Sequence, residues 1–84
     1  MDQFAVKVFV RLRPSVLDPA GEATKSASIK LGAQGIKSLR IGKMIEIKME
    51  GNGENEVREN INLLCDRLLA NTVSEDYEYS LERL

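Results

Sequence analysis

An alternating run of apolar residues near the start of the chain most constrains its fold. Between residues 4 and 13, every second side chain is large and apolar: Phe4, Val6, Val8, Val10 and Leu12. Successive side chains of a strand point to opposite faces, so this period of two predicts a strand with one buried face. Pro14 cannot donate a hydrogen bond to a sheet ladder and is expected to end the strand.

Two helices are predicted farther along. Asp18-Pro19 is a helix start, with Asp18 as N-cap and Pro19 in the first helical position, and Gly32 is the expected stop. The second helix follows the break at residues 51–53. Its apolar residues recur at helical spacing, which gives a regular stripe: Val57, Ile61, Leu64 and Leu68.

Residues 36–50 alternate without a change of parity across Gly42, and residues 73–81 alternate as a last strand. The first segment is either a hairpin turning near Gly42 or one long strand bent there. The unbroken parity favours the bent strand. Such a strand would reach about 45–50 Å, so part of it would need strands from another subunit.

The order strand, helix, long strand, helix, strand predicts an α+β fold. We expect a single domain over residues 1–84, a two-layer sandwich of an antiparallel sheet with two helices on one face. The long central strand is expected to bend near Gly42 and to be shared in an oligomer. A chain of 84 residues has a thin core, and self-association adds buried surface.

Several function classes are excluded by residues that are absent. There is no His, and the one cysteine, Cys65, cannot form an internal disulfide or a metal cluster. We therefore expect no catalytic, cofactor-binding or metal-ligating residue in this chain. No apolar run approaches the ~20 residues that cross a bilayer, so a cytoplasmic location without membrane contact is expected.

Charge is divided unevenly along the chain. Residues 1–48 hold nine Lys/Arg and four Asp/Glu, a net +5, and residues 49–84 hold three and nine, a net −6. Either the two parts interleave and pair their surface charges, or two faces meet different partners. Nucleic-acid binding is not expected, because stacking aromatics are few and the acidic part opposes a polyanion.

Candidate interface residues come from the two strands, the first helix and the loop before it. Phe9 lies on the polar side of the first strand, Ile29 lies opposite the small-residue stripe of the first helix, and Gly42 marks the bend. The full set of partner or interface candidates is Phe9, Arg11, Arg13, Val16, Leu17, Ile29, Arg40, Gly42 and Lys43. From the residues alone, a small-molecule-sensing or RNA-binding ferredoxin-like module stays open as an alternative to an interaction module.

Three segments carry a family resemblance. They are VFVRLRPSVLDPAG at residues 8–21, RIGKMIE at residues 40–46 and LLANTVSEDY at residues 68–77. Together, and in this order, they resemble the PurS family, the small subunit of phosphoribosylformylglycinamidine synthase. The sequence departs from the family pattern at Arg13, Ser15 and Thr72, where the family has Lys, Gly and Pro.

The resemblance implies a PurS-like, ferredoxin-related fold and a non-catalytic subunit of an ATP-binding ligase complex in purine biosynthesis. In that family a glutaminase subunit releases ammonia from glutamine. A synthetase subunit uses ATP and magnesium to place it on formylglycinamide ribonucleotide, so this subunit needs no cofactor. The implied partners are the chain itself, as a dimer or tetramer, and the synthetase and glutaminase subunits. The implied role is to bridge the two and assist ammonia transfer, with the loop around Val16 and Leu17 touching the synthetase.

Overall fold

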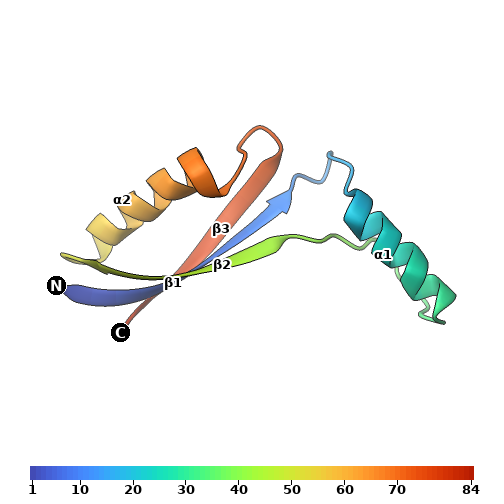
Figure 1. Cartoon of the computed structure of the whole chain (residues 1–84), viewed down its shortest axis with the longest axis horizontal. Coiled ribbons are helices and arrows are strands. Elements are labelled where there is room, and N and C mark those ends of the chain that lie inside the picture. The colour runs from blue at the N-terminus through green and yellow to red at the C-terminus, as the bar shows by residue number, and fades with distance from the viewer.

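The computed structural model describes residues 1–84 and has three strands and two α-helices. In chain order the elements are β1 (Asp2–Leu12), α1 (Pro19–Lys30), β2 (Lys43–Gly51), α2 (Glu54–Leu64), a π-helical turn η1 (Cys65–Leu69) and β3 (Glu75–Arg83). The strands form one antiparallel sheet in the order β2-β1-β3, so β1 is central (Figure 1). The predicted α+β class, with an antiparallel sheet and two helices, is confirmed.

The alternation in β1 is confirmed residue by residue. Phe4, Val6, Val8 and Val10 are at most 2% exposed, whereas the residues between them are exposed or partly buried. The register places Ile45, Ile47 and Met49 of β2 beside these residues, and Tyr77, Tyr79 and Leu81 of β3 on their other side. This face of the sheet therefore forms the floor of a single apolar core.

Helix α2 covers that floor. Val57, Ile61 and Cys65 are fully buried against it. The helix then widens into η1, and a π-helical turn inserts an extra residue into the helical spacing. The predicted stripe is therefore wrong at its last position: Leu68 is 74% exposed, and Leu69 and Ala70 face the core instead.

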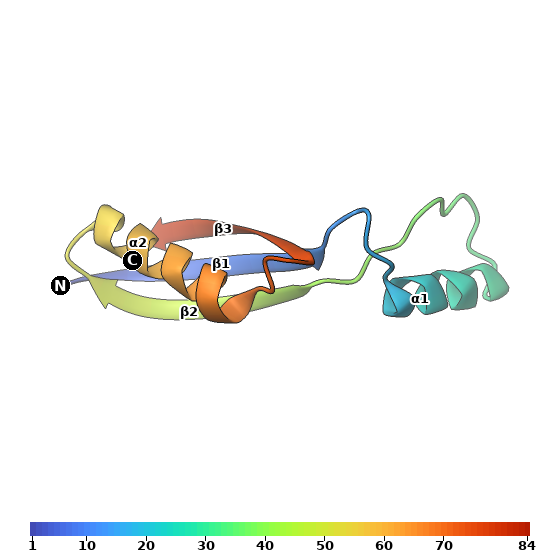
Figure 2. The same cartoon turned by 90° about the horizontal axis from the view of Figure 1, so that it is seen from above.

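Helix α1 lies beyond the end of the sheet rather than over its face (Figures 1 and 2). Helix α2 thus covers the sheet as expected, whereas α1 extends away from it as an arm. Gly21 is the one buried residue of α1, and its stripe of alanines is exposed. A short helix whose apolar side is made of alanines has little to gain from covering a wide sheet.

The arm makes the chain elongated. Its principal extents are 52 × 27 × 15 Å and its radius of gyration is 16.5 Å. A compact domain of this length has a radius of gyration of about 12 Å. Both termini lie at the end of the sheet that is farther from α1 (Figure 1).

The segment around Gly42 neither forms a hairpin nor stays in the sheet along its whole length. Residues 31–42 return from the tip of α1 beside that helix and run on through Gly42 into β2 without reversing (Figure 2). Strand pairing begins only at Lys43, opposite Val10, because β1 ends two residues later and residues 36–41 have no neighbouring strand. The direction of the predicted long strand is right, but its first part is unpaired.

Neither α1 nor α2 combines the length and the apolar composition that a membrane-spanning helix requires.

Candidate protein interface at the neck

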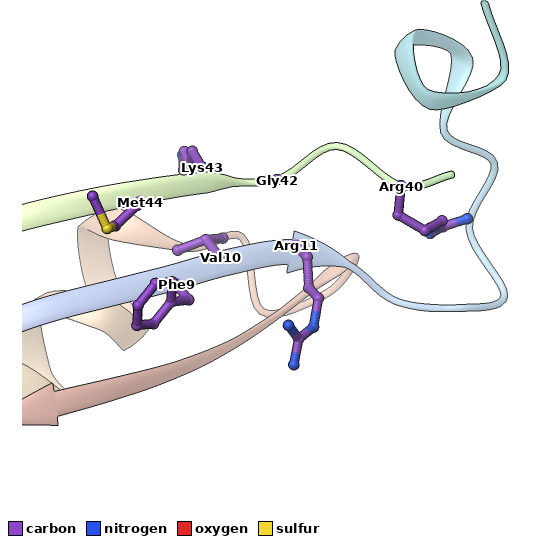
Figure 3. Close-up of a pocket in the computed structure, with 7 residues that line it drawn as sticks. All are labelled: Phe9, Val10, Arg11, Arg40, Gly42, Lys43 and Met44. Atoms are coloured by element: carbon purple, nitrogen blue, oxygen red, sulfur yellow. The ribbon is translucent and has the colours of Figure 1, made fainter. Parts of the chain in front are cut away.

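The arm joins the sheet through two stretches of chain, residues 11–18 and residues 39–43, which we call the neck. An open hollow of about 380 Å³ lies at its sheet side. Seven residues line it: Phe9, Val10, Arg11, Arg40, Gly42, Lys43 and Met44 (Figure 3). Five of the nine candidates chosen from the sequence are among them, although they come from segments about thirty residues apart.

The apolar part of this hollow is a cross-strand pair. Phe9 of β1 lies directly opposite Met44 of β2, and both side chains are on the sheet face that α2 leaves open. They are 37% and 49% exposed. Side chains paired in this way across two strands form a small continuous surface. Sequence reasoning missed Met44, although its parity with Glu46 and Lys48 already placed it on the same face as Phe9.

Basic side chains border this pair, and most of them bind groups within the chain. Arg11 forms an ion pair with Glu78 at 3.3 Å, and Arg13 forms one with Asp76 at 3.2 Å. Arg13 also donates to the carbonyl oxygen of Thr72. These pairs join the basic first part of the chain to its acidic last part, which favours interleaved charges over two separate charged faces. Lys43 forms no ion pair.

Arg40 borders the hollow, and its guanidinium points toward the loop before α1 (Figure 3). Its guanidinium donates to backbone carbonyl oxygens of that loop, including that of Val16 at 2.9 Å.

Asp18 is 4% exposed and caps α1 as predicted, accepting from the N–H of Gly21 at 3.0 Å. Its other oxygen accepts from the N–H of Ile41 at 2.7 Å, a contact that the sequence did not reveal. The N–H groups of Ile41 and Gly21 hold the pKa of the Asp18 carboxyl below its usual value.

Four candidates lie outside the hollow. Arg13 and Val16 belong to the loop that follows β1 and take part in the contacts with Asp76 and Arg40 given above. Leu17, in the loop before α1, is 72% exposed, and Ile29 is exposed near the far end of α1. The structure thus gathers most candidates at or beside the neck, and it leaves the apolar side chains of Leu17 in the neck and Ile29 in the arm exposed. No group of three or more His, Cys, Asp or Glu side chains is placed to hold a metal ion.

The composition of this region is suited to contact with other proteins. Its residues are an exposed aromatic–methionine pair, a free lysine and an arm with exposed apolar side chains, and apolar side chains bordered by cations are typical of protein interfaces. The fold and this surface define a small α+β protein with the features of a subunit rather than of a catalyst in its own right.

Comparisons with known proteins identify the member of that class. The family model for PurS, phosphoribosylformylglycinamidine (FGAM) synthase, matches residues 5–83. The chain is 45% identical to the PurS subunit of Synechocystis over 78 residues, which cover 93% of this chain and 78% of that one. The chain belongs to the PurS family, whose members are subunits of the FGAM synthase of purine biosynthesis.

Solved structures agree with this assignment. The structure of Bacillus subtilis PurS matches with a TM-score of 0.85 at 39% identity, covering 94% of this chain and 98% of that one. A chain in the structure of PurLQS from Thermotoga maritima matches with a TM-score of 0.87 at 31% identity, over the full length of both chains. The elongated shape with a projecting arm is therefore a fold that solved PurS structures share.

Proposed function

We propose that this chain is a non-catalytic adaptor that associates with itself and bridges the synthetase and glutaminase subunits of FGAM synthase, where it assists ammonia transfer. The observation that carries the proposal is the surface that the arm leaves uncovered. The chain exposes 6086 Å², whereas a compact monomer of its mass exposes about 5,000 Å². The surplus, about 1,100 Å², exceeds the area of about 800 Å² that each partner buries in a standard protein–protein contact.

Self-association is the part of the proposal that the arm supports most directly. Isolated helices shorter than ~12–15 residues are marginal in water, and α1 has 12 residues with little contact to the rest of the chain. Its exposed side includes alanines that permit close approach, together with Ile29. A second copy of the chain could cover the exposed side of α1, and it could also supply a neighbouring strand for residues 36–41. The proposed state is a dimer or a tetramer, in the cytoplasm.

Contact with the larger subunits is assigned to the hollow beside the neck. Phe9 and Met44 supply the apolar area, and Lys43 supplies a cation that no acidic group of this chain neutralises. The solved PurLQS structure from Thermotoga maritima contains a chain of this fold. In our proposal ATP and magnesium bind to the synthetase subunit, and this chain holds no cofactor.

The test mixes three purified chains: this one and the synthetase and glutaminase subunits from the same source. Glutamine-dependent synthesis of formylglycinamidine ribonucleotide should require all three, whereas synthesis from added ammonia should need only the synthetase. If the two larger subunits use glutamine equally well without this chain, the adaptor role is refuted.

A matched pair of variants tests the assigned surface. Phe9→Ala should weaken binding to the larger subunits by about tenfold, the loss typical of a partly buried apolar contact. Leu84→Ala, a similarly large exposed residue at the opposite end of the molecule, should leave binding unchanged. Sedimentation of the chain alone tests self-association, and a strict monomer at micromolar concentration would contradict that part.

A further inference from the structure

Two of the three segments that carry the family resemblance meet at the neck. Asp18 and Gly21 belong to the segment at residues 8–21, and Arg40 and Gly42 belong to the segment at residues 40–46. Neither an interface nor a catalytic step accounts for all four, because Asp18 and Gly21 are buried and the guanidinium of Arg40 is bonded to backbone carbonyl oxygens of this chain. Their contacts with backbone groups suggest a different role.

Asp18 uses each of its carboxylate oxygens for a different segment. Oδ1 accepts from the N–H of Gly21 at 3.0 Å, which caps α1. Oδ2 accepts from the N–H of Ile41 at 2.7 Å, on the chain returning from the arm. Capping needs only the first of these bonds. The second ties the start of α1 to the segment that enters β2.

Arg40 completes the connection in the opposite direction. Its Nη2 lies 2.8 Å from the carbonyl oxygen of Arg13, 2.9 Å from that of Val16 and 3.3 Å from that of Leu12. Nη2 carries two hydrogens, so the two shorter contacts are the main bonds. Hydrogen bonds from a charged donor are about twice as strong as neutral ones, and a planar guanidinium holds a fixed direction that a lysine ammonium does not. One side chain on the returning segment thus gathers the outgoing loop.

The two glycines allow these segments to touch. A Cβ at Gly21 would overlap the carbonyl oxygen of Leu39, and a Cβ at Gly42 would overlap the carbonyl oxygen of Val10. The returning segment therefore passes between the start of α1 and the end of β1 with backbone against backbone. Any side chain at either position would push the two segments apart.

We propose that Asp18, Gly21, Arg40 and Gly42 form a clasp that sets the direction in which the arm leaves the sheet. Helix α1 has few contacts with the sheet or with α2. Lys25 Nζ donates to the carbonyl oxygen of Lys37 at 2.9 Å, but this bond joins the helix to the segment returning beside it and not to the sheet. The clasp closes the loop 13–17 and the returning segment into one unit. Without the clasp, α1 would be attached to the sheet only through two flexible stretches of chain, and with it the arm has a defined orientation. This role belongs to the single chain and does not depend on the proposed complex.

The test measures the orientation of the arm in the full chain. Spin labels on Ser26→Cys in α1 and Ser80→Cys in β3 report the distance between arm and sheet, with labelled chain diluted into unlabelled chain to suppress distances between copies. Cys65 is fully buried and stays unlabelled in the folded chain. Arg40→Ala should broaden the distance distribution markedly. Arg11→Ala, which removes a neck arginine bonded to Glu78 alone, should leave it narrow.

Amide hydrogen exchange provides the second measurement. Asp18→Asn keeps an oxygen for the Gly21 cap but turns an NH2 group toward Ile41. The Ile41 amide should then exchange about tenfold faster, the effect of losing one hydrogen bond to a charged group. Amides of β1 and α2 should be unchanged in every variant, which shows that the sheet is folded. A narrow, unshifted distance distribution in Arg40→Ala, or unchanged exchange at Ile41 in Asp18→Asn, would overturn the proposal.

Discussion

Replacing Ile61 or Leu68 by alanine tests where the apolar stripe of α2 ends. If the helix continued without interruption, both residues would occupy core positions. In the structure, Ile61 is fully buried and Leu68 is 74% exposed, because η1 shifts the spacing by one residue. Each substitution removes three carbons, so the two variants differ in burial rather than in chemistry.

The expected magnitudes differ several-fold. Three buried carbons at about 0.8 kcal/mol each give about 2.4 kcal/mol for Ile61→Ala, and the cavity left behind raises the loss to about 3–4 kcal/mol. Leu68→Ala should cost less than about 0.5 kcal/mol, as for surface substitutions in general. A domain of this length has a total stability of about 4–13 kcal/mol, so the first loss is a large share of it.

Thermal and urea unfolding followed by circular dichroism measure both losses. Since 1 kcal/mol shifts the Tm of a domain this size by about 4–8 °C, Ile61→Ala should lower the Tm by at least about 12 °C. Measurements at low and high chain concentration separate contacts within a copy from contacts between copies. Equal losses for the two variants at the lowest concentration would refute the π-helical shift of the stripe.

Three further predictions concern Tyr77, Cys65 and Gly42. The Tyr77 hydroxyl donates to Asp66 Oδ1 at 2.8 Å, and this bond raises the pKa of Tyr77 from 10.0 to about 12. The contribution of the bond to stability is therefore complete below pH 10 and is lost as the pH rises toward 12, so Tyr77→Phe should flatten the pH dependence of the unfolding free energy in that window. Burial raises the pKa of the Cys65 thiol, so a thiol reagent should react at least about a hundredfold more slowly with the folded chain than with the chain unfolded in urea. Comparable reaction rates would show that α2 opens readily. A Cβ at Gly42 would overlap the carbonyl oxygen of Val10, so Gly42→Ala should lower the free energy of unfolding in urea by about 1–3 kcal/mol, whereas Ser38→Ala nearby should leave it unchanged. Equal stability of the two variants would contradict the close approach of Gly42 to Val10.

The sheet and α2 could be predicted from the sequence because their burial is periodic. In β1 the buried residues Phe4, Val6, Val8 and Val10 recur at every second position, and this signal depends only on the pleat of the strand. The cap of α1 by Asp18 was equally local, since its acceptor and donor are three residues apart. Local geometry of this kind is written in the spacing of residue types.

What could not be predicted depends on partners distant in the sequence. Parity at residues 36–50 describes an extended chain but says nothing of whether a neighbouring strand lies beside residues 36–41. The direction of α1 depends on Arg40, whose acceptors are backbone carbonyl oxygens, and every residue type carries one of these. The π-helical shift at Leu68 is likewise a change in backbone hydrogen bonding that side-chain spacing does not reveal.

The strand order has a consequence for how assemblies of this chain end. Only β1 is paired on both sides, so β2 and β3 each present an unpaired backbone edge, which is where sheets recruit further strands. On the sheet face that α2 leaves open, the charged side chains of β3 are all carboxylates: Asp76, Glu78 and Glu82. Arg13 and Arg11 of β1 and its following loop pair with the first two, but an antiparallel copy of β3 would still set carboxylate against carboxylate. On β2 the charges alternate as Glu46, Lys48 and Glu50, and an antiparallel copy can set lysine against glutamate. If two copies of this chain joined their sheets, β2 would therefore be the more favourable edge, and the β3 edges left outside would oppose the addition of further copies.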